Sequence, residues 1–282
     1  MSKIRYHFIK KLISNPSAVL GLGLISLFLI VALLGPFIAP QDPYKINFEY
    51  KLAPPGTDGF LLGTDNYGRD ILTRLIYGTR ISLLISLSIT AISSSIGLLV
   101  GVFSAYMGNL VDEVVMRVTE IFMAIPPFLF AMIIVVVLGP GLFNVVIALV
   151  LVWWPPYTRL ARSKVLSVKQ ETFVEAGRAL GMPTGRIVLK HIVPNSLSPI
   201  LVQATMDVGG VILTATGLSF LGLGAQRPTP EWGLMVSLAR SYLEIAWWYP
   251  IFPGLTIALF VFSFNIFGDA VRDIVDPRLT SF

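Results

Sequence analysis

Residues 121–158 read IFMAIPPFLFAMIIVVVLGPGLFNVVIALVLVWWPPYT and contain no Asp, Glu, Lys or Arg. A helix that crosses the hydrocarbon core of a bilayer needs about 20 predominantly apolar residues. The stretch is too long for one such helix, and Gly-Pro-Gly at 139–141 is a turn signal that breaks a helix there. It therefore predicts two membrane spans, at 122–138 and 142–160, joined by a tight external turn.

The rest of the chain has the same character. Hydrophobic residues make up 55% of the sequence and charged residues only 13%, against roughly 25% charged in a soluble globular domain. Uncharged runs predict four further spans, at 17–38, 80–105, 197–222 and 248–270. Asp207 alone interrupts the run that holds the third of these. The predicted fold is an all-α membrane protein with about six transmembrane helices.

Two clusters of basic residues predict the orientation, because Lys and Arg accumulate in short cytoplasmic loops. One cluster lies before the first span, and the other follows the fourth span, between residues 159 and 190. The first consists of Lys3, Arg5, Lys10 and Lys11, and the second of Arg159, Arg162, Lys164, Lys169, Arg178, Arg186 and Lys190. Four spans separate the clusters, so both lie on one side, which predicts cytoplasmic N- and C-termini.

The spans and loops suggest three parts. Residues 1–16 form a cytoplasmic N-terminal segment, and residues 17–79 hold the first span and an external segment. Residues 80–282 form a five-span domain with a cytoplasmic loop at about 161–196. The first span resembles a signal peptide but is too long, and prolines stand where a small-residue cleavage site is required, so we expect an uncleaved anchor.

Motifs of enzymes and metal proteins are absent from the sequence. It has no G-x-x-x-x-G-K-[ST] phosphate loop, no H-E-x-x-H helix and no G-x-S-x-G elbow, and it contains no cysteine. The two histidines, His7 and His191, have no clustered partners. We expect no catalytic, cofactor or metal site, and the net charge of +5 reflects cytoplasmic loops rather than a nucleic-acid partner. Any energy source must be a partner or an ion gradient.

A polar stretch, VEAGRALGMPTGRIVLKHIVPNS at residues 174–196, stands between two apolar runs and is called the elbow below. An amphipathic helix is expected from about Ser163 to the residue before Gly181. Gly181 suits the left-handed residue after a helix, and Pro183 suits the first turn of a second helix, which we expect to stop at Pro194. The elbow is either a solvated basic loop that only sets topology or a rigid lever that docks on a cytoplasmic partner.

The elbow resembles the EAA loop of ABC importer permeases, whose consensus is E-A-A-x-x-x-G followed by I-x-L-P. Glu175-Ala176-Gly177, then Gly181, then Pro194 match its spacing, with glycine in place of the second alanine. His191 and Val193 replace the consensus isoleucine and leucine, while KHIVPNSLSPI is similar to the peptide-transporter branch.

Three other stretches resemble dipeptide and oligopeptide permeases of the C type. They are NPSAVLGLGLISLFLIVALLGPFIAPQDPY at 15–44, LGTDNYGRDILTRLIYGTRISL at 62–83 and TGLSFLGLGAQRPTPEWG at 216–233. Members of this family often carry an acidic residue just before L-S-F-L-G-L-G, whereas this chain has TATG there. The resemblance therefore does not imply, for this chain, any substrate recognition that depends on that acidic residue in its relatives.

The resemblance implies a permease subunit that forms half of a translocation pathway for peptides. It implies a second permease subunit in a heterodimer, two ATPase subunits, an extracytoplasmic solute-binding protein and surrounding membrane lipid as partners. Glu175 would make polar or ionic contact with an ATPase, Gly181 would shape the bend and Pro194 would end the lever. Ala176 and Gly177 would belong to the same ATPase-coupling segment. Nickel or oligosaccharide import within the same superfamily remains open. A stand-alone channel or secondary transporter, and an intramembrane enzyme, are the alternatives from other classes.

Polar residues near the predicted fifth span are candidate pathway residues. Asp207 is costly inside a membrane and marks a functional site by default. Gln203 is the second candidate. Asp207 has three possible roles. It lines the pathway, it belongs to a structural hydrogen-bond network, or it is hydrated near the cytoplasm.

Two further segments carry charges beside apolar residues. The residues around 111–122 have valines at helical spacing and predict an amphipathic helix on the inner surface. DNYGRDILTRLIYGTR at 65–80 carries Asp65, Arg69, Asp70 and Arg74. These charges either pair with one another in an interfacial helix or dock a binding protein.

Overall fold

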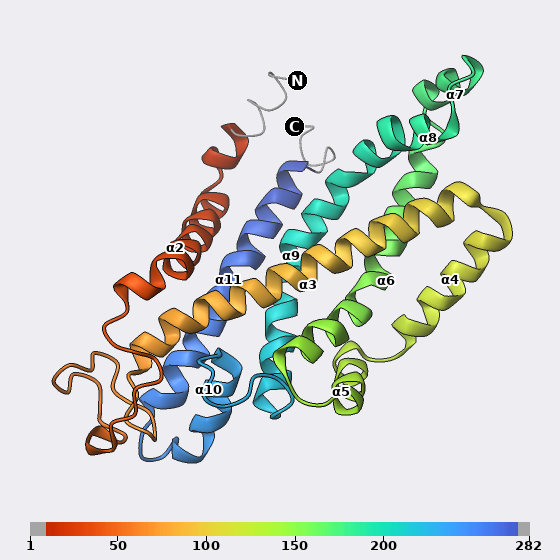
Figure 1. Cartoon of the computed structure of the whole chain (residues 1–282). Helices are drawn as coiled ribbons and strands as arrows, with labels where there is room; N and C mark the ends of the chain where they lie inside the picture. The colour runs from red at the N-terminus through yellow and green to blue at the C-terminus, as the bar shows by residue number, and fades with distance from the viewer. Residues whose placement is uncertain (1–9, 276–282) are drawn as a thin grey trace. The chain divides into compact units, whose positions relative to one another are not determined.

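A computed structural model describes residues 10–275 of the chain, so the predicted cytoplasmic residues Lys3 and Arg5 lie outside the described part (Figure 1). The longer helices are α2 (Pro16–Ile38), α3 (Ile71–Met107), α4 (Asn109–Ala124), α5 (Pro127–Leu138), α6 (Leu142–Val168), α9 (Val193–Phe220) and α11 (Trp248–Val275). The shorter ones are η1 (Phe48–Tyr50), α7 (Thr172–Ala179), α8 (Thr184–Ile187), η2 (Val188–Ile192), α10 (Trp232–Ala239) and η3 (Arg240–Tyr242). No β-strand occurs between residues 10 and 275, which confirms the all-α prediction.

Five helices are long and apolar enough to cross a bilayer, namely α2, α3, α6, the continuous helix Thr184–Phe220 and α11. The pair α4 and α5 passes the same test jointly, although the two helices are bent by 90°. Counting this pair as one span gives the six that the sequence predicted.

The predicted third span at 122–138 is wrong as a single helix. Helix α4 ends at Ala124, and Ile125 is extended, with φ −93° and ψ 132°. A residue that precedes proline is pushed out of the α region, and Pro126 follows Ile125. Helix α5 alone, at 12 residues, rises only about 18 Å, so it cannot cross a core about 30 Å thick.

Helix α6 continues beyond its predicted end at residue 160 to Val168, and the amphipathic helix expected from Ser163 is interrupted at 169–171. Val168 and Val174 are both buried in one apolar cluster. Six residues apart, they would point about 120° away from each other on a straight helix. The interruption lets both side chains face the same core.

The chain divides into two compact units. Among the described residues, unit 1 contains residues 10–88, 134–146 and 205–275, and unit 2 contains residues 89–133 and 147–204. Helices α3, α5, α6 and α9 each contribute residues to both units.

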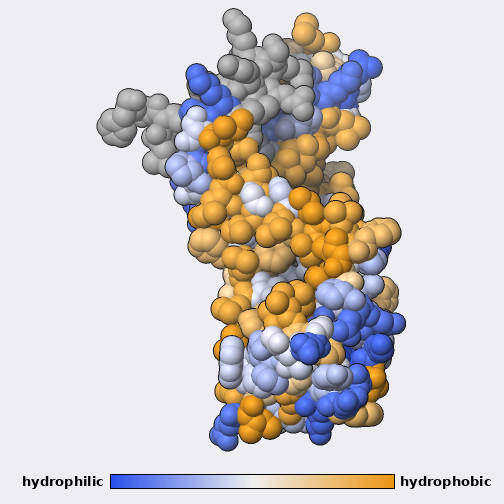
Figure 2. Space-filling model, turned by 90° about the vertical axis from the view of Figure 1, so that its left-hand side faces the viewer, coloured by the Kyte–Doolittle hydropathy of each residue, from blue (hydrophilic) through white to orange (hydrophobic). Residues whose placement is uncertain are grey.

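The core of unit 1 is aromatic. Phe28 of α2, Trp232 of α10 and Phe260 of α11 form a triangle with ring centroids 5.1 to 6.0 Å apart. The opposite side of α2 exposes large apolar residues, among them Leu20, Leu27, Leu33 and Phe37. Figure 2 shows the face on which α2 lies, with hydrophobic side chains over its middle and hydrophilic ones gathered at its lower end. This surface suits a helix that meets lipid.

Residues 39–74 and 221–247 of unit 1 form a structure that we call the cap. Arg74 is 1% exposed and donates hydrogen bonds to the carbonyl oxygens of Pro43, Pro228 and Thr229 at 2.8 to 3.3 Å. The indole of Trp232 donates to the carbonyl oxygen of Leu75 at 3.2 Å. The bonds that involve Pro228, Thr229 and Trp232 join segments more than 150 residues apart in the chain.

Unit 2 packs the second half of α3 against α6. Gly97 and Gly101 stand four residues apart, the small-residue spacing that lets helices approach closely in membranes. A Cβ added at Gly101 would meet the Thr158 carbonyl oxygen at 2.5 Å. The backbones of α3 and α6 are therefore in contact. Helix α4 runs beside α6 in Figure 1.

Candidate functional site

The elbow begins with α7 and a tight turn. Gly181 has φ +72°, as predicted for the residue after a helix. The amide of Met182 donates to the Gly177 carbonyl at 3.0 Å, and the amide of Gly181 donates to the Arg178 carbonyl at 2.9 Å. These two bonds form a Schellman motif, which satisfies carbonyls at the end of α7. Pro183 then stands directly before α8.

The second helix of the elbow does not stop at Pro194, so that prediction was wrong. Helix α8, the π-turn η2 and α9 form one helix from Thr184 to Phe220. In the π-turn the amide of Val193 donates to the Val188 carbonyl, a bond five residues long. This wider turn directly precedes Pro194, which has no amide hydrogen to donate.

The π-turn also sets which side chains are buried. Ile187 and Ile192 are both almost fully buried in the apolar cluster of unit 2. In a regular α-helix, residues five apart point about 140° away from each other. A turn closed by a bond between residues five apart brings the two isoleucines onto one side.

The elbow has a buried inner side and an exposed outer side. Val174 and Gly177 of α7 face inward with the two isoleucines. A Cβ added at Gly177 would meet Met182 and Ile187 only at 3.9 and 4.0 Å, so an alanine would fit there. The departure from the consensus at this position therefore leaves the packing unchanged. On the outer side, Leu180 is 85% exposed and Leu189 is 71% exposed.

The structure brings the predicted coupling residues into one small region of unit 2. Glu175 and Ala176 are exposed on α7, Gly177 is buried beneath them, and Gly181 lies in the turn. Pro194 is exposed at the second position of α9. The ring of Phe173 lies 6.0 Å from that of His191, which connects α7 to the π-turn just before Pro194. Sequence reasoning did not single out Leu180, although an apolar residue beside a helix-ending glycine is a visible signal.

Polar contacts fix the base of the elbow. Lys169 donates to the Ala105 carbonyl at 2.8 Å, and its ammonium group lies 5.4 Å from the ring centre of Tyr106. Arg162 of α6 donates to Asp112 of α4 at 2.7 Å, and a second bond joins the same two side chains. Sequence reasoning missed this pair, because no periodicity relates residues that are 50 positions apart.

The two pathway candidates lie on α9. Gln203 and Asp207 are half-buried and four residues apart, so they share one side of the helix. The charges at 65–74 belong instead to the cap. Arg69 and Asp65 pair at 2.6 Å, which confirms the predicted pairing, but they are buried and precede α3 rather than forming an interfacial helix.

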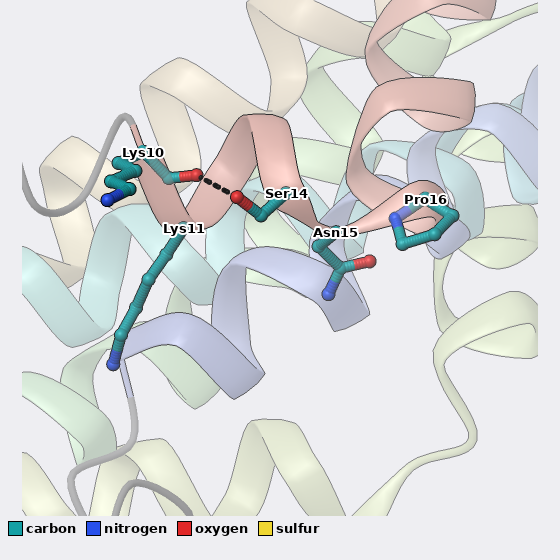
Figure 3. Close-up of a pocket in the computed structure, with 5 residues that line it drawn as sticks. All are labelled: Lys10, Lys11, Ser14, Asn15 and Pro16. Atoms are coloured by element: carbon teal, nitrogen blue, oxygen red, sulfur yellow. Dashed lines mark hydrogen bonds between the residues drawn. The ribbon is translucent and has the colours of Figure 1, made fainter.

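A cavity of about 490 Å³ lies where the chain enters α2, lined by Lys10, Lys11, Ser14, Asn15 and Pro16 (Figure 3). The Ser14 hydroxyl donates to the Lys10 carbonyl at 2.8 Å, and the Asn15 side chain accepts from two amides of α2. These polar groups therefore cap helices, and the lysines belong to the first basic cluster. Between residues 10 and 275 no group of three or more His, Cys, Asp or Glu could hold a metal ion.

Comparison with solved structures shows the fold. An inward-facing structure of the MetNI methionine ABC transporter has a TM-score of 0.58 and 20% identity, covering 73% of this chain and 98% of that chain. A second crystal form of the same transporter has a TM-score of 0.51 and 19% identity, covering 70% of this chain and 95% of that chain.

Comparison with known sequences extends the likeness to nearly the whole chain. The di/tripeptide transport system permease protein DppC of Pseudomonas aeruginosa is 44% identical over 94% of this chain and 89% of its own length. The dipeptide transport system permease protein DppC of Escherichia coli K12 is 41% identical over 97% of this chain and 92% of its own length.

Two family models match consecutive parts of the chain. The N-terminal transmembrane domain of oligopeptide transport permease C matches residues 6–55, which include α2. The binding-protein-dependent transport system inner membrane component matches residues 97–281, which include the elbow, α9 and α11. With the apolar helices and the relatives, these matches show that the chain belongs to the family of binding-protein-dependent transport system inner membrane components.

Proposed function

We propose that the chain is the permease subunit of an ATP-driven importer and forms half of a translocation pathway for short peptides. The observation that carries this proposal is the elbow, which presents an exposed outer side on a well-packed base in a chain of a transporter family. Relatives from different bacteria, more than 40% identical over nearly the whole chain, are named as dipeptide or di/tripeptide permeases. Their names support peptides as the substrate class.

The proposed partners are a second permease subunit, two ATPase subunits and an extracytoplasmic solute-binding protein. The chain contains no phosphate loop, so ATP hydrolysis is assigned to the ATPase subunits. The two basic clusters favour cytoplasmic termini and a cytoplasmic elbow. In this arrangement residues 80–282 form the five-span permease domain, with the coupling loop at about 161–196. The cap lies on the external side of the membrane.

The elbow would work as the coupling element. Leu180 and Leu189 offer an apolar surface of the kind that partner proteins cover, and Glu175 adds a charge beside it. Gly181 sets the bend, and the helix that carries Pro194 continues from the elbow as far as Phe220. Nucleotide bound to the ATPases and peptide bound to the pathway would then bias one conformational equilibrium, which is the definition of allosteric coupling.

The pathway role falls to Asp207 and Gln203. A carboxylate within an apolar helix is costly unless it faces protein or water. Each side chain places a polar group in an apolar helix and is half-buried, which supports a role for each in contact with a solute in transit.

The test reconstitutes the chain with its partners in lipid nanodiscs and liposomes and compares wild type with Glu175→Ala. An interface charge that loses a buried partner costs about 2–5 kcal/mol of binding. We therefore expect wild type to import a dipeptide, and Glu175→Ala to retain fewer ATPase subunits during purification and to import less peptide.

The matched control is Glu244→Ala, the same substitution at an exposed position of the cap. Both variants should keep the thermal stability of wild type, because exposed substitutions cost within about 0.5 kcal/mol. Wild-type uptake by Glu175→Ala would contradict the coupling role. Uptake of nickel or an oligosaccharide, but not of peptides, by wild type would contradict the substrate class.

A further inference from the structure

A charged groove lies between α4 and α6 within unit 2. It contains a cavity of about 340 Å³ lined by Met116, Glu120, Arg159, Arg162 and Ser163. A second cavity of about 310 Å³ shares Met116, Glu120 and Arg162 with the first, so the two are neighbours. We call the larger cavity the charged groove. Its volume lies in the range of sites that hold small ligands.

The surface of α4 explains why charges gather there. One side packs on α6, where the Phe122 ring lies 5.5 Å from that of Trp154. The next side exposes apolar residues, including Leu110, Val114 and Ile121. The remaining side carries Glu120 and the other charged residues toward the groove. A helix in a membrane protein with one lipid-compatible side and one charged side must turn the charges toward protein or water.

The charges in the groove are unequally paired. Arg162 and Asp112 form a two-bond pair that satisfies both groups. Among residues 10–275, Glu120 pairs only with Arg117, at 3.3 Å, and both side chains are more than half exposed. Such exposed pairs contribute at most about 1 kcal/mol, so the Glu120 carboxylate can exchange its partner at little cost.

Arg159 has no carboxylate partner among residues 10–275. Within that described part of the chain its guanidinium donates only to the sulfur of Met123, at 3.7 Å. A thioether is a weak acceptor. The groove thus offers one cation without an anionic partner and one loosely held carboxylate on the walls of the same cavity.

We propose that the charged groove is a transit site for the two ends of a zwitterionic peptide. Arg159 pairs with the α-carboxylate, and Glu120 pairs with the α-ammonium group. This inference rests on the proposed function, and it identifies which chemical groups of the substrate the chain itself reads. Both side chains are exposed, so binding is weak, which suits a site that must release its solute.

The test measures binding to the complete complex of both permeases and both ATPases in nanodiscs, without the solute-binding protein. The probe is alanyl-photoleucine, a dipeptide whose diazirine side chain crosslinks on illumination, and mass spectrometry maps the labelled residues. We expect labels within 112–123 and 158–163. Arg159→Gln and Glu120→Gln should each reduce this labelling up to about fivefold, the scale of an exposed ion pair.

End-blocked probes separate the two roles. Amidation of the probe's carboxylate should abolish the difference between wild type and Arg159→Gln, and acetylation of its amine should abolish the difference between wild type and Glu120→Gln. Lys164→Gln is the matched control, because it removes a cation from α6 that does not line the groove. It should label like wild type.

The outcomes distinguish the inference from the function on which it rests. Wild-type uptake of the dipeptide, with labels elsewhere or with equal labelling in Arg159→Gln and Glu120→Gln, would overturn the transit site alone. Failure of the wild-type transporter to take up any peptide would overturn the proposed function and the transit site with it.

Discussion

The cap of unit 1 and the elbow of unit 2 both lie between apolar helices and both carry charges, but they use those charges in opposite ways. In the cap, Asp65, Arg74 and Glu231 are buried. In the elbow, Glu175 and Arg178 are exposed on the surface of α7. Buried charges that bond to backbone fix the shape of a segment, whereas exposed charges leave binding capacity for another molecule.

The cost of burial explains the difference. A charge removed from water is tolerated only where hydrogen bonds or an opposite charge compensate for lost hydration. Asp65 accepts hydrogen bonds from the Tyr67 amide and the Arg69 side chain at 2.8 and 2.6 Å, respectively. The elbow is instead held by apolar packing beneath α7 and by the turn at Gly181. We therefore expect substitutions in the cap to affect stability and substitutions in the elbow to affect coupling.

The largest expected effect is that of Arg74→Met. It removes the donor to the carbonyl oxygens of Pro43, Pro228 and Thr229, of which Thr229 keeps the amide of Glu231, and it removes one of the two cations beside Asp65. Removing one partner of a buried pair typically costs about 3–5 kcal/mol. Unfolding in detergent, followed by tryptophan fluorescence, should show a much lower Tm. Arg117→Met, in an exposed pair, is the control, and equal Tm values for the two variants would refute the assignment of a structural role to the cap charges.

The next effect is a dependence of cap stability on pH. Burial raises the pKa of Glu231 above its usual range, although its two oxygens accept the amides of Gly233 and Leu234 at 2.9 and 2.8 Å. Because the folded pKa exceeds the unfolded one, stability is greatest below the unfolded value, 4.5, and is lost as pH rises through the folded value. The slope for one proton reaches about 1.4 kcal/mol per pH unit at most.

Glu231→Gln should flatten that part of the pH profile, because the amide does not titrate. The measurement is Tm against pH upward from 4.5 for wild type and variant. Glu244→Gln, at an exposed cap position, should retain the wild-type slope. A slope that survives in Glu231→Gln would assign the pH dependence to another group.

A smaller effect on stability, and the sharpest test of the contrast, is expected from Gly181→Ala. An alanine at φ +72° is strained by about 1–2 kcal/mol, and that strain is confined to an exposed turn. Nothing lies within 4 Å of an added Cβ, so no steric clash adds to the strain. We expect a small decrease in Tm and a larger decrease in the peptide imported per ATP hydrolysed. Gly185→Ala, in α8 with equally open space and no positive φ, is the control and should import normally.

The apolar runs predicted where the spans lie, but not where their helices end. Hydropathy reports which residues tolerate lipid, whereas a helix continues as long as its backbone bonds and side-chain packing permit. Helix α3 therefore starts at Ile71, nine residues before the predicted span, and α6 continues to Val168. The prolines at 155 and 156 lie inside α6 without ending it.

Within the candidate site, local requirements were easier to predict than long-range ones. Gly181 was identifiable because a left-handed residue after a helix favours glycine. The prediction that the helix stops at Pro194 was wrong, because the cost of a proline depends on whether the preceding turn can widen. Packing of the neighbouring residues determines whether it can. The pairs of Arg162 with Asp112 and of Arg74 with the cap carbonyls depend on tertiary contacts that leave no periodic signal in the sequence.

The π-turn at Val188–Ile192 determines which changes in chain length between Gly181 and Pro194 the protein tolerates. Loss of one residue there would yield a regular α-helix, so neither helix content nor backbone bonding would reveal the change. In that helix Ile187 and Ile192 would stand four residues apart, about 40° around the axis, so both would still face their cluster in unit 2. Natural selection should therefore accept the loss of one residue within this turn and reject a change of length in the regular helix that follows, which would rotate the next side chains by about 100°.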